Sequence, residues 1–366
     1  MKRIPLDTLS VMIKPASSAC NLTCKYCFYT DVSENRSTAS YPVMTEETVM
    51  TIAQRINEAL DHKGTVNISF QGGEPTTAGL SFFEMFTKIF EAYTDIEVHY
   101  SMQTNATRIN DAWAQFLQEH HFLVGVSLDG YQTNMDHYRY DVQKRSVYFQ
   151  VLRGIDCLKK ANVEFNILTV VTNELSKHGS SLLKFYLEHH FDYVQLIPCL
   201  PGLTETENEI SLTPEQYASF YIDFFQAWKK AYMKGNRISV NLFENLAGML
   251  AGIPPYQCGM IGRCSVQYVI EANGNVYPCD FYCLDEDCLG NLKDASFDQL
   301  SNCPKAKEFL ASSNCMKEPC RDCPVRAYCN GGCHRQNVCY LNAEFCAYQK
   351  VLLIILPQLQ QMIPQR

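Results

Sequence analysis

Three cysteines near the N-terminus have a spacing that suits an iron–sulfur cluster. The stretch Cys20-Asn-Leu-Thr-Cys24-Lys-Tyr-Cys27 has the form C-x3-C-x2-C and directly follows a predicted strand. Three thiolates on one tight loop can bind three irons of a [4Fe–4S] cluster and leave the fourth iron without a protein ligand. A zinc site would need a fourth ligand nearby and more often shows paired Cys-x2-Cys. The triad therefore predicts a cluster with an open coordination position.

Cysteines are also dense in the C-terminal part, where 13 of the 18 lie beyond residue 255. Ligation is their expected use, because a reducing compartment does not favour disulfides. Their pattern is C-x9-G-x4-C, a gap, C-x2-C-x5-C-x3-C, a gap, and C. The four cysteines from Cys320 to Cys333 would also suit a structural zinc ion, so that alternative stays open. With Cys258 included, eight thiolates could bind two complete [4Fe–4S] clusters: Cys258, Cys264, Cys279, Cys320, Cys323, Cys329, Cys333 and Cys346.

Seven cysteines have no expected ligand role. Core packing is expected for Cys157 and Cys199, which fall on or beside regular elements. Proximity to a cluster stays open for Cys283 and Cys288. The remaining three are Cys303, Cys315 and Cys339.

Polar residues follow several predicted strands and could bind a ligand at the carboxyl edge of a sheet. Gln71-Gly72-Gly73-Glu74-Pro75 comes after one strand, and its glycines let the backbone approach a ligand closely. The alternative is that Gly-Gly-Glu-Pro is merely a turn. Gln103-Thr104-Asn105 and Ser127-Leu128-Asp129-Gly130 end the next two strands.

These motifs lie on a repeat of short β-rich runs and longer helical segments, which predicts a parallel sheet or barrel with helices outside. The predicted strands are Leu9–Ile13, Val66–Phe70, Glu97–Ser101, Phe122–Ser127, Glu164–Val171 and Tyr193–Ile197. The predicted helices are Thr45–Leu60, Leu80–Tyr93, Asp111–Glu119, Ser146–Lys160, Ser180–His190 and an aromatic-rich helix over residues 213–234, which we expect to be core. A last helix, Phe345–Met362, should be kinked or ended early by Pro357.

The composition narrows the possible functions. The 366 residues are 46% hydrophobic and 19% charged, as in ordinary globular proteins. A net charge of -8 without a dense Lys/Arg block argues against nucleic-acid binding. The apolar stretch near the N-terminus is short and interrupted, and the run Val351–Leu356 is too short for a bilayer. We therefore expect a cytoplasmic protein that binds neither nucleic acid nor a membrane.

The triad, with Tyr26 before its third cysteine, resembles the C-x3-C-x-aromatic-C signature of the radical S-adenosylmethionine (SAM) superfamily. This resemblance implies that the open iron chelates the amino and carboxylate groups of SAM, whose reductive cleavage yields a 5′-deoxyadenosyl radical. It implies that Gly72, Gly73 and Glu74 hold the cofactor's ammonium, that Ser127 faces its ribose or methionine portion and that Arg139 faces its carboxylate. Ser127 could instead be a loop residue and Arg139 a solvated charge. The full implied cofactor-binding set is Tyr26, Gln71, Gly72, Gly73, Glu74, Gln103, Asn105, Ser127, Arg139 and Leu196.

The C-terminal cysteine pattern resembles the SPASM domain of radical SAM enzymes that modify peptides. In that family, Cys258, Cys264, Cys279 and Cys333 would hold the nearer auxiliary cluster. Cys320, Cys323, Cys329 and Cys346 would hold the outer one. The resemblance implies an α/β fold: a partial (β/α)6 TIM-like barrel over residues 1–240, a small cysteine-rich SPASM domain over 241–346, and a C-terminal helix over 347–366.

Within this subgroup, the chain resembles the anaerobic sulfatase-maturating enzymes over almost its entire length. Such enzymes oxidise a cysteine or serine of a sulfatase to Cα-formylglycine without oxygen. The radical removes a Cβ hydrogen, and loss of a proton and one more electron gives a thioaldehyde or aldehyde. The matching segments are Ile13–Ser18, Tyr26–Tyr29, Phe70–Thr76, Val124–Gly130, Phe165–Leu168 and Tyr277–Tyr282.

This resemblance also implies partners and roles. Asp280, beside ligand Cys279, would be the base that takes the substrate proton; its alternative role is a cap or a hydrogen-bond acceptor for the cluster loop. Tyr29, Gln71 and Gln103 would line the substrate pocket. The substrate would be a sulfatase polypeptide carrying Cys/Ser-x-Pro-x-Arg, and a flavodoxin- or ferredoxin-like protein would supply electrons.

Two other functions remain open. One is a different SPASM maturase, for example a thioether-forming enzyme, although those often carry an added peptide-binding domain. The other is a non-catalytic electron-transfer or metal-storage protein with three clusters. The open-site triad argues against this carrier, which would want every iron capped.

Overall fold

The computed structural model describes residues 7–313 and 317–363, so Cys315 lies outside the described residues. The chain forms two compact units. The first comprises the described residues of Met1–Ser127, Arg139–Phe165 and Ser265–Leu310. The second comprises those of Leu128–Tyr138, Asn166–Cys264 and Ala311–Arg366.

The first unit is built on a sheet whose central strands are parallel. Its strand order is β12-β11-β10-β1-β3-β4-β5; β11 runs antiparallel to both of its neighbours. The strands are β1 (Thr8–Ile13), β3 (Gly64–Phe70), β4 (Ile96–Thr104), β5 (Leu123–Ser127), β10 (Val269–Ile270), β11 (Asn275–Tyr277) and β12 (Gly290–Asn291). A separate antiparallel pair joins β2 (Leu22–Cys24) to β6 (Arg139–Asp141).

The register brings the carboxyl ends of the parallel strands to one edge. Ile13 pairs with Phe70, Phe70 with Met102, and Thr104 with Val126. Each of these strands carries a predicted site residue at its carboxyl end or in the loop that follows it. The predicted parallel α/β arrangement is therefore confirmed for this unit.

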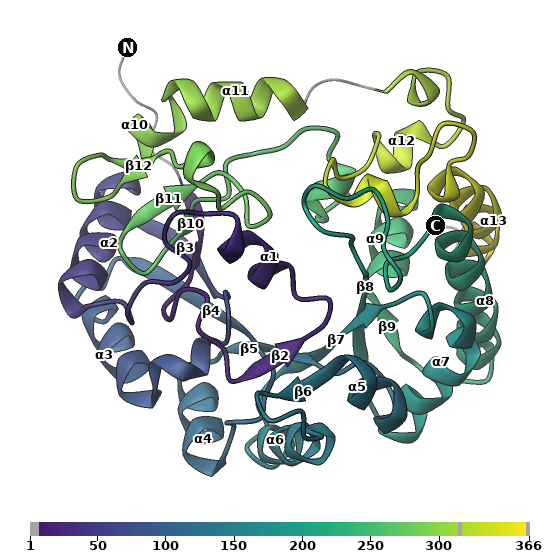
Figure 1. Ribbon diagram of the computed structural model, residues 1–366, viewed down its shortest axis with the longest axis horizontal. Coiled ribbons are helices and arrows are strands. Elements are labelled where there is room, and N and C mark those ends of the chain that lie inside the picture. Colours follow the sequence, from purple (N-terminus) through teal and green to yellow (C-terminus); the bar gives the residue numbers. More distant parts are fainter. Residues whose placement is uncertain (1–6, 314–316, 364–366) are drawn as a thin grey trace. The chain divides into compact units, whose positions relative to one another are not determined.

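Helices cover the outer side of this sheet, where α2, α3 and α4 lie along β3, β4 and β5 (Figure 1). Thr45 caps α2 by accepting a hydrogen bond from the Thr48 amide, as its position before two glutamates predicts. Phe70 on β3 contacts Phe83 and Phe86 of α3 with ring centroids 4.9 Å apart. The helices are α1 (Phe28–Glu34), α2 (Glu46–Ala59), η1 (Pro75–Ala78), α3 (Leu80–Phe90), α4 (Asp111–Glu119), α6 (Tyr148–Lys160), η4 (Asp285–Asp287), α10 (Phe297–Ser301) and α11 (Pro304–Ser313).

The second unit contains three parallel strands, in the order β7-β8-β9, and a layer of helices. Aromatic side chains of α8 are buried, which confirms that this helix belongs to the core. The strands are β7 (Phe165–Val171), β8 (Tyr193–Pro198) and β9 (Ser239–Val240). The helices are α5 (Gln132–Tyr138), η2 (Leu175–His178), α7 (Gly179–Glu188), α8 (Pro214–Met233), α9 (Asn241–Leu250), η3 (Cys258–Met260), η5 (Glu318–Cys320), α12 (Arg326–Cys329), η6 (Gln336–Cys339) and α13 (Ala347–Met362).

Of the two expected effects of Pro357 on the last helix, an early end is wrong: α13 continues through Pro357 to Met362. The proline removes the hydrogen bond to the carbonyl of Leu353. Both Pro357 and Leu353 are exposed, so water can satisfy that carbonyl. Burial of Ile355 and Leu359 on the other side of the helix stabilises the continuation.

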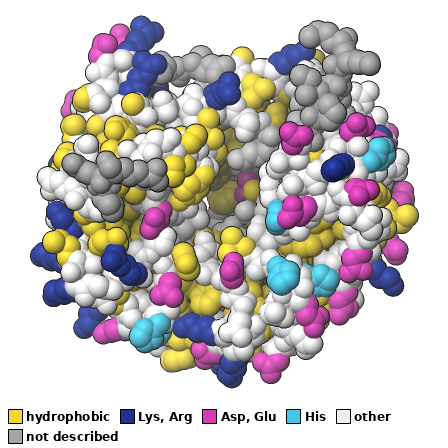
Figure 2. Space-filling model, turned by 180° about the vertical axis from the view of Figure 1, so that it is seen from behind, with side chains coloured by type: hydrophobic (Ala, Val, Ile, Leu, Met, Phe, Trp, Pro, Cys, Tyr) yellow, Lys and Arg dark blue, Asp and Glu magenta, His cyan; other side chains and the backbone are white. Residues whose placement is uncertain are grey.

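Surface charge follows the composition. On the face in Figure 2, Lys and Arg side chains are dispersed, with Asp and Glu between them. No helix in the described part of the chain is long and apolar enough to cross a membrane. Cys199 is buried, as predicted, whereas Cys157 is only half-buried on α6.

Candidate active site

The cysteine triad lies on the chain between β1 and α1, in the first unit. Cys20 precedes β2, Cys24 ends it, and Cys27 is the N-cap of α1. Desolvation, together with the smaller effect of the nearby Glu74 and Cys27 charges, raises the pKa of the Cys20 thiol to about 11. Thiolates held this close repel one another, so positively charged iron would stabilise the group. The three residues predicted to bind one cluster therefore fit it.

Arg139 is brought to the triad by the pairing of β2 and β6. Its backbone lies opposite that of Cys24, and its guanidinium is 5.7 Å from the centroid of the Tyr26 ring. The arginine is 7% exposed, and its charge lowers the pKa of Cys20. Arg139 is thus a buried cation beside the triad and could face a ligand carboxylate.

The Gly-Gly-Glu loop packs directly on the segment that precedes Cys20. The Gly73 amide donates to the carbonyl of Ser17 at 3.0 Å, and the Glu74 amide donates to that of Ala19 at 2.8 Å. A Cβ atom on Gly73 would lie 2.2 Å from the Ala19 oxygen, so only glycine allows this approach. Backbone hydrogen bonds therefore hold this glycine-rich loop against the segment that leads into the triad.

The Glu74 carboxylate organises the next loop along the sheet. Its Oε1 accepts hydrogen bonds from the Thr76 amide, the Thr76 hydroxyl and the Thr104 hydroxyl, and its Oε2 accepts one from the Asn105 amide at 2.7 Å. Oε2 keeps a further lone pair, which an ammonium could use. Asn105 Nδ2 in turn lies 3.9 Å from Cys20 Sγ. Glu74 and Asn105 are thus brought together with the triad, as the expected cofactor set requires.

Three other residues of the expected cofactor set lie on strands. Ser127 is the last residue of β5, and Gln103 lies on β4, paired with Gly125. Leu196 lies on β8 in the second unit, where its carbonyl accepts a hydrogen bond from the Tyr221 hydroxyl at 3.2 Å.

Asp280 is held by two residues close to the triad in sequence. Lys14 Nζ lies 3.0 Å from Asp280 Oδ1, and the Tyr29 hydroxyl donates to Oδ2 at 2.7 Å. The same hydroxyl lies 3.2 Å from Gln71 Oε1. The structure therefore unites Asp280, Tyr29 and Gln71 in one network, which is chemically suited to accept a proton from a bound side chain.

Lys14 is the member of this network that the sequence does not single out. It is 3% exposed; burial lowers its pKa, but the charges of Asp280 and its neighbours outweigh that effect and raise the pKa overall, so the ammonium stays protonated. Its Nζ also lies 3.2 Å from Cys283 Sγ. The one available signal is a lysine directly after an apolar strand, at the edge where ligands bind.

Cys283, for which the sequence leaves proximity to a cluster open, is a buried thiol. Burial raises its pKa to about 12, although the Lys14 charge opposes this shift. It contacts the network around Asp280 through Lys14, while Cys288 is half-buried farther along the loop. No further role follows for either cysteine.

Four C-terminal cysteines line one cavity in the second unit: Cys320, Cys323, Cys329 and Cys346. Its volume is 130 Å³, roughly ten times the space that a single water needs. Burial, together with the smaller effect of the charges of the other three thiols, raises the pKa of Cys329 to about 11. A mutually repelling thiolate set around a roomy cavity fits an iron–sulfur cluster better than one ion. No group of three such side chains is arranged for a single metal ion within residues 7–313 and 317–363.

Three of the other four cysteines also lie together in this unit. The charges of Cys333 and Cys264 raise the pKa of Cys258, after the larger effect of burial. A Cβ on Gly259 would lie 3.1 Å from the Cys333 Cβ, so the two segments are in close contact. The fourth cysteine, Cys279, belongs to the first unit, where it precedes Asp280.

Family comparisons agree with this arrangement. Residues 15–186 match the radical SAM superfamily, and residues 258–324 match an iron–sulfur cluster-binding domain, SPASM. A cysteine-type anaerobic sulfatase-maturating enzyme of Clostridium novyi is 40% identical over 335 residues, covering 90% of this chain and 89% of the relative. A serine-type enzyme of Klebsiella aerogenes is 29% identical, covering 88% and 79%.

A solved structure extends the similarity to three dimensions. Native anSMEcpe with bound AdoMet and a Cp18Cys peptide is matched with a TM-score of 0.89 and 36% identity. The match covers 97% of this chain and 98% of that one.

Proposed function

Because the chain belongs to the family of anaerobic sulfatase-maturating enzymes, we propose that it oxidises a cysteine or serine of a sulfatase to Cα-formylglycine without oxygen. The observation that carries this proposal is the network of Asp280, Lys14 and Tyr29 beside the triad. The Asp280 carboxylate is 13% exposed and can take a proton, and the two residues that hold it lie on either side of the triad in the sequence.

The residues present fit two kinds of cofactor. Three [4Fe–4S] clusters would be held by Cys20, Cys24 and Cys27, by Cys258, Cys264, Cys279 and Cys333, and by Cys320, Cys323, Cys329 and Cys346. SAM would be held by the triad cluster, the Gly-Gly-Glu loop and the expected set around them, including Tyr26, Gln103, Asn105, Ser127, Arg139 and Leu196. When bound, this cofactor supplies the 5′-deoxyadenosyl radical that removes a substrate hydrogen.

The protein's own groups then handle the proton and the substrate. Asp280 accepts the thiol or hydroxyl proton of the substrate through one of its carboxylate oxygens. Lys14 compensates the charge of Asp280 and Tyr29 orients it; the 2.7 Å contact between the Tyr29 hydroxyl and Oδ2 supports this assignment. Gln71, bonded to the same hydroxyl, and Gln103 contribute polar contacts to the substrate.

Cysteine is the proposed preferred substrate residue. The chain is 40% identical to cysteine-type relatives and 29% identical to a serine-type relative. The peptide would carry Cys-x-Pro-x-Arg. A flavodoxin- or ferredoxin-like protein would supply electrons, and we place the enzyme in the cytoplasm, where thiols stay reduced.

A peptide assay tests the proposal. Reduced, reconstituted enzyme is incubated anaerobically with SAM and peptides that differ only at one position: Cys-x-Pro-x-Arg, Ser-x-Pro-x-Arg and Ala-x-Pro-x-Arg. We expect a mass change corresponding to formylglycine, fastest for the cysteine peptide and absent for the alanine peptide. Cofactor cleavage with all three peptides unchanged would contradict sulfatase maturation and favour another peptide maturase.

Replacing Asp280 tests the proton acceptor separately. Asp280→Asn keeps the side chain's shape but removes its ability to accept the proton as a carboxylate. We expect formylglycine formation to fall about 100-fold or more while cofactor cleavage continues. Full product formation by this variant would exclude Asp280 as the base.

A further inference from the structure

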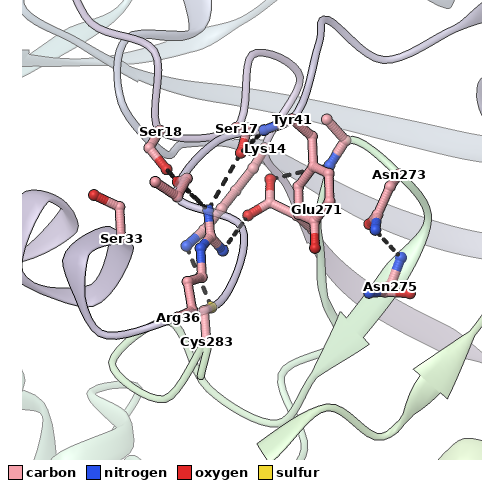
Figure 3. Close-up of polar contacts among 12 residues, drawn as sticks. Lys14, Ser17, Ser18, Ser33, Arg36, Tyr41, Glu271, Asn273, Asn275 and Cys283 are labelled. Carbon is pink, nitrogen blue, oxygen red and sulfur yellow. Dashed lines mark hydrogen bonds and ion pairs between the residues drawn. The ribbon is translucent and has the colours of Figure 1, made fainter. Parts of the chain in front are cut away.

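Arg36 is a buried arginine that joins separate parts of the first unit. Its Nη1 donates to Glu271 Oε2 at 2.7 Å, and its Nη2 donates to Ser18 Oγ at 2.9 Å and to the Ala39 carbonyl at 3.0 Å. Ser17 Oγ is a fourth acceptor, at 3.3 Å. Figure 3 shows the guanidinium between the two serines and Glu271. One side chain therefore joins its own segment to the Ser17–Ser18 turn and to Glu271, which is 235 positions away.

Ser17 and Ser18, which Arg36 contacts, are connected to the expected cofactor loops. Ser17 and Ser18 belong to the turn that ends at Cys20, and the carbonyl of Ser17 accepts the amide of Gly73. The carbonyl of Ala19 accepts the amide of Glu74. The position of Arg36 is thus transmitted to the Gly-Gly-Glu loop through hydrogen bonds, without direct contact.

Glu271, the carboxylate partner of Arg36, belongs to the segment that leads to Asp280. Glu271 directly follows β10 and is fully buried, and its Oε1 accepts the Ala272 amide at 3.0 Å. The preceding residue, Ile270, accepts the Lys14 amide at 2.9 Å. This hairpin continues through β11 to Asp280, so the junction ties the triad loop to the chain that carries the proposed proton acceptor.

We propose that Arg36 is a positioning residue for SAM: it fixes the triad turn and the Gly-Gly-Glu loop in the geometry that binds the cofactor. This inference rests on the proposed function for the identity of the ligand. The planar guanidinium contacts Glu271 and Ser18 at once, whereas a lysine ammonium is a single point charge. A buried ion pair contributes little net stability compared with apolar packing, so fixing geometry accounts for it better than stability does.

The test compares Arg36→Lys with a matched variant. Lysine keeps the charge opposite Glu271 but cannot span to the serines. Arg55→Lys is the control, because Arg55 likewise joins a helix to a distant carbonyl, that of Leu292 at 2.9 Å, without contacting the triad turn. Both variants are made in the full chain and reconstituted anaerobically. Iron content, thermal midpoint, the Kd for SAM by equilibrium dialysis and hydrogen exchange over residues 71–76 are measured.

We expect Arg36→Lys to retain its iron and to raise the Kd for SAM about 10-fold, as loss of a supporting hydrogen-bond partner does at other cofactor sites. Exchange over residues 71–76 should become faster, because the Gly73 and Glu74 amides lose a fixed acceptor. Arg55→Lys should change neither quantity. An iron-replete Arg36→Lys protein with unchanged Kd and exchange would overturn the proposal.

Two further results are possible, a variant that does not fold and a wild type without the proposed activity, and the experiment gives a decision in both. If Arg36→Lys does not fold, the Ser17→Ala/Ser18→Ala variant removes the two serine contacts and leaves the buried Arg36–Glu271 ion pair in place; a raised Kd supports the proposal and an unchanged Kd refutes it. If the wild type binds SAM but forms no formylglycine, the proposed function fails while the Kd comparison still decides the role of Arg36. A wild type that binds no SAM refutes both.

Discussion

Lys14 Nζ lies 3.0 Å from Asp280 Oδ1, and the two side chains are 4% and 13% exposed. The pair joins the start of the triad loop to the residue after Cys279. An ammonium placed against one carboxylate oxygen leaves the other oxygen to the Tyr29 hydroxyl. The orientation of the proposed proton acceptor, which follows β11, therefore depends on a residue that directly follows β1, two strands away in the sheet.

Replacing Lys14 should separate substrate oxidation from cofactor cleavage. Lys14→Met preserves the side chain's length but leaves Asp280 without its buried counter-charge, which costs about 3–5 kcal/mol of stability. We expect formylglycine formed per 5′-deoxyadenosine to fall roughly 10–100-fold. Both products are measured by mass spectrometry in one anaerobic reaction.

Lys14→Arg serves as the control, because it keeps the positive charge opposite Asp280. This variant should retain more of the product ratio than Lys14→Met. Equal ratios for wild type and Lys14→Met would show that the ion pair has no role in substrate oxidation.

Gly73→Ala should damage the cofactor loop through steric conflict. The added Cβ would lie 2.2 Å from the Ala19 oxygen and 2.5 Å from the Ser18 oxygen, both backbone atoms. The loop must shift away from the triad turn, and we expect SAM affinity to fall at least about 10-fold. Equilibrium dialysis measures the affinity. Gly248→Ala in α9, where the nearest atom is 3.7 Å away, is the control and should bind SAM normally. Normal binding by Gly73→Ala would contradict the packing described.

Metal analysis tests the cluster assignment independently of catalysis. Eleven proposed ligands for three clusters predict about twelve irons and twelve sulfides per chain after reconstitution. Replacing Cys20, Cys24 and Cys27 with alanine should leave about eight irons, because the C-terminal sets remain, and should abolish 5′-deoxyadenosine formation. Iron content below eight in this variant would mean that the triad is needed for the other clusters.

Zinc in place of the outer cluster would appear in the same analysis. A Cys320→Ala/Cys323→Ala variant should lose about four irons and no zinc. Loss of zinc instead would assign the cavity lined by Cys329 and Cys346 to a structural ion.

Local sequence patterns are sufficient to predict most of the helices and strands. The short β-rich run Val66–Phe70 predicts a strand, and β3 spans Gly64–Phe70. The threonine and paired acids at Thr45 predict a helix start, and α2 begins at Glu46. The strands β2 and β6 escape prediction because each has three residues and no measurable period. Their pairing nevertheless brings Arg139 opposite Cys24.

The site is harder to predict from the sequence than the regular elements, because its contacts join residues that are far apart in the chain. Spacing alone indicates the triad, and resemblance indicates Asp280. Neither identifies Arg36, whose partner Glu271 is 235 positions away, or Lys14, which is 269 positions from Cys283. Buried cations carry no periodic signal, since their position is set by a carboxylate elsewhere in the chain.

Two neighbouring aspartates of η4 should respond to pH in opposite ways. Burial and then the nearby Glu286 charge raise the pKa of Asp287 to about 6. The Ser37 amide, which donates to Asp285 Oδ2 at 2.6 Å, lowers the pKa of Asp285 below 3.8. A raised pKa means that the folded state holds its proton more tightly than the unfolded state. Ionised Asp287 therefore destabilises the fold increasingly from about pH 4 to pH 6, and constantly above that.

Substitution by asparagine distinguishes the two cases. Asp287→Asn removes an unfavourable charge, so its thermal midpoint should exceed that of the wild type at pH 8, by more than at pH 5. Asp285→Asn weakens a favourable hydrogen bond whose stabilisation is present above the unfolded pKa of about 3.8 and is lost only as pH falls through the lower folded value. Its midpoint should therefore be lowered equally at pH 5 and pH 8. Scanning calorimetry of the reconstituted proteins at both pH values measures the shifts. A lower midpoint for Asp287→Asn at pH 8 would show that its carboxylate stabilises the loop, contrary to the burial that raises its pKa.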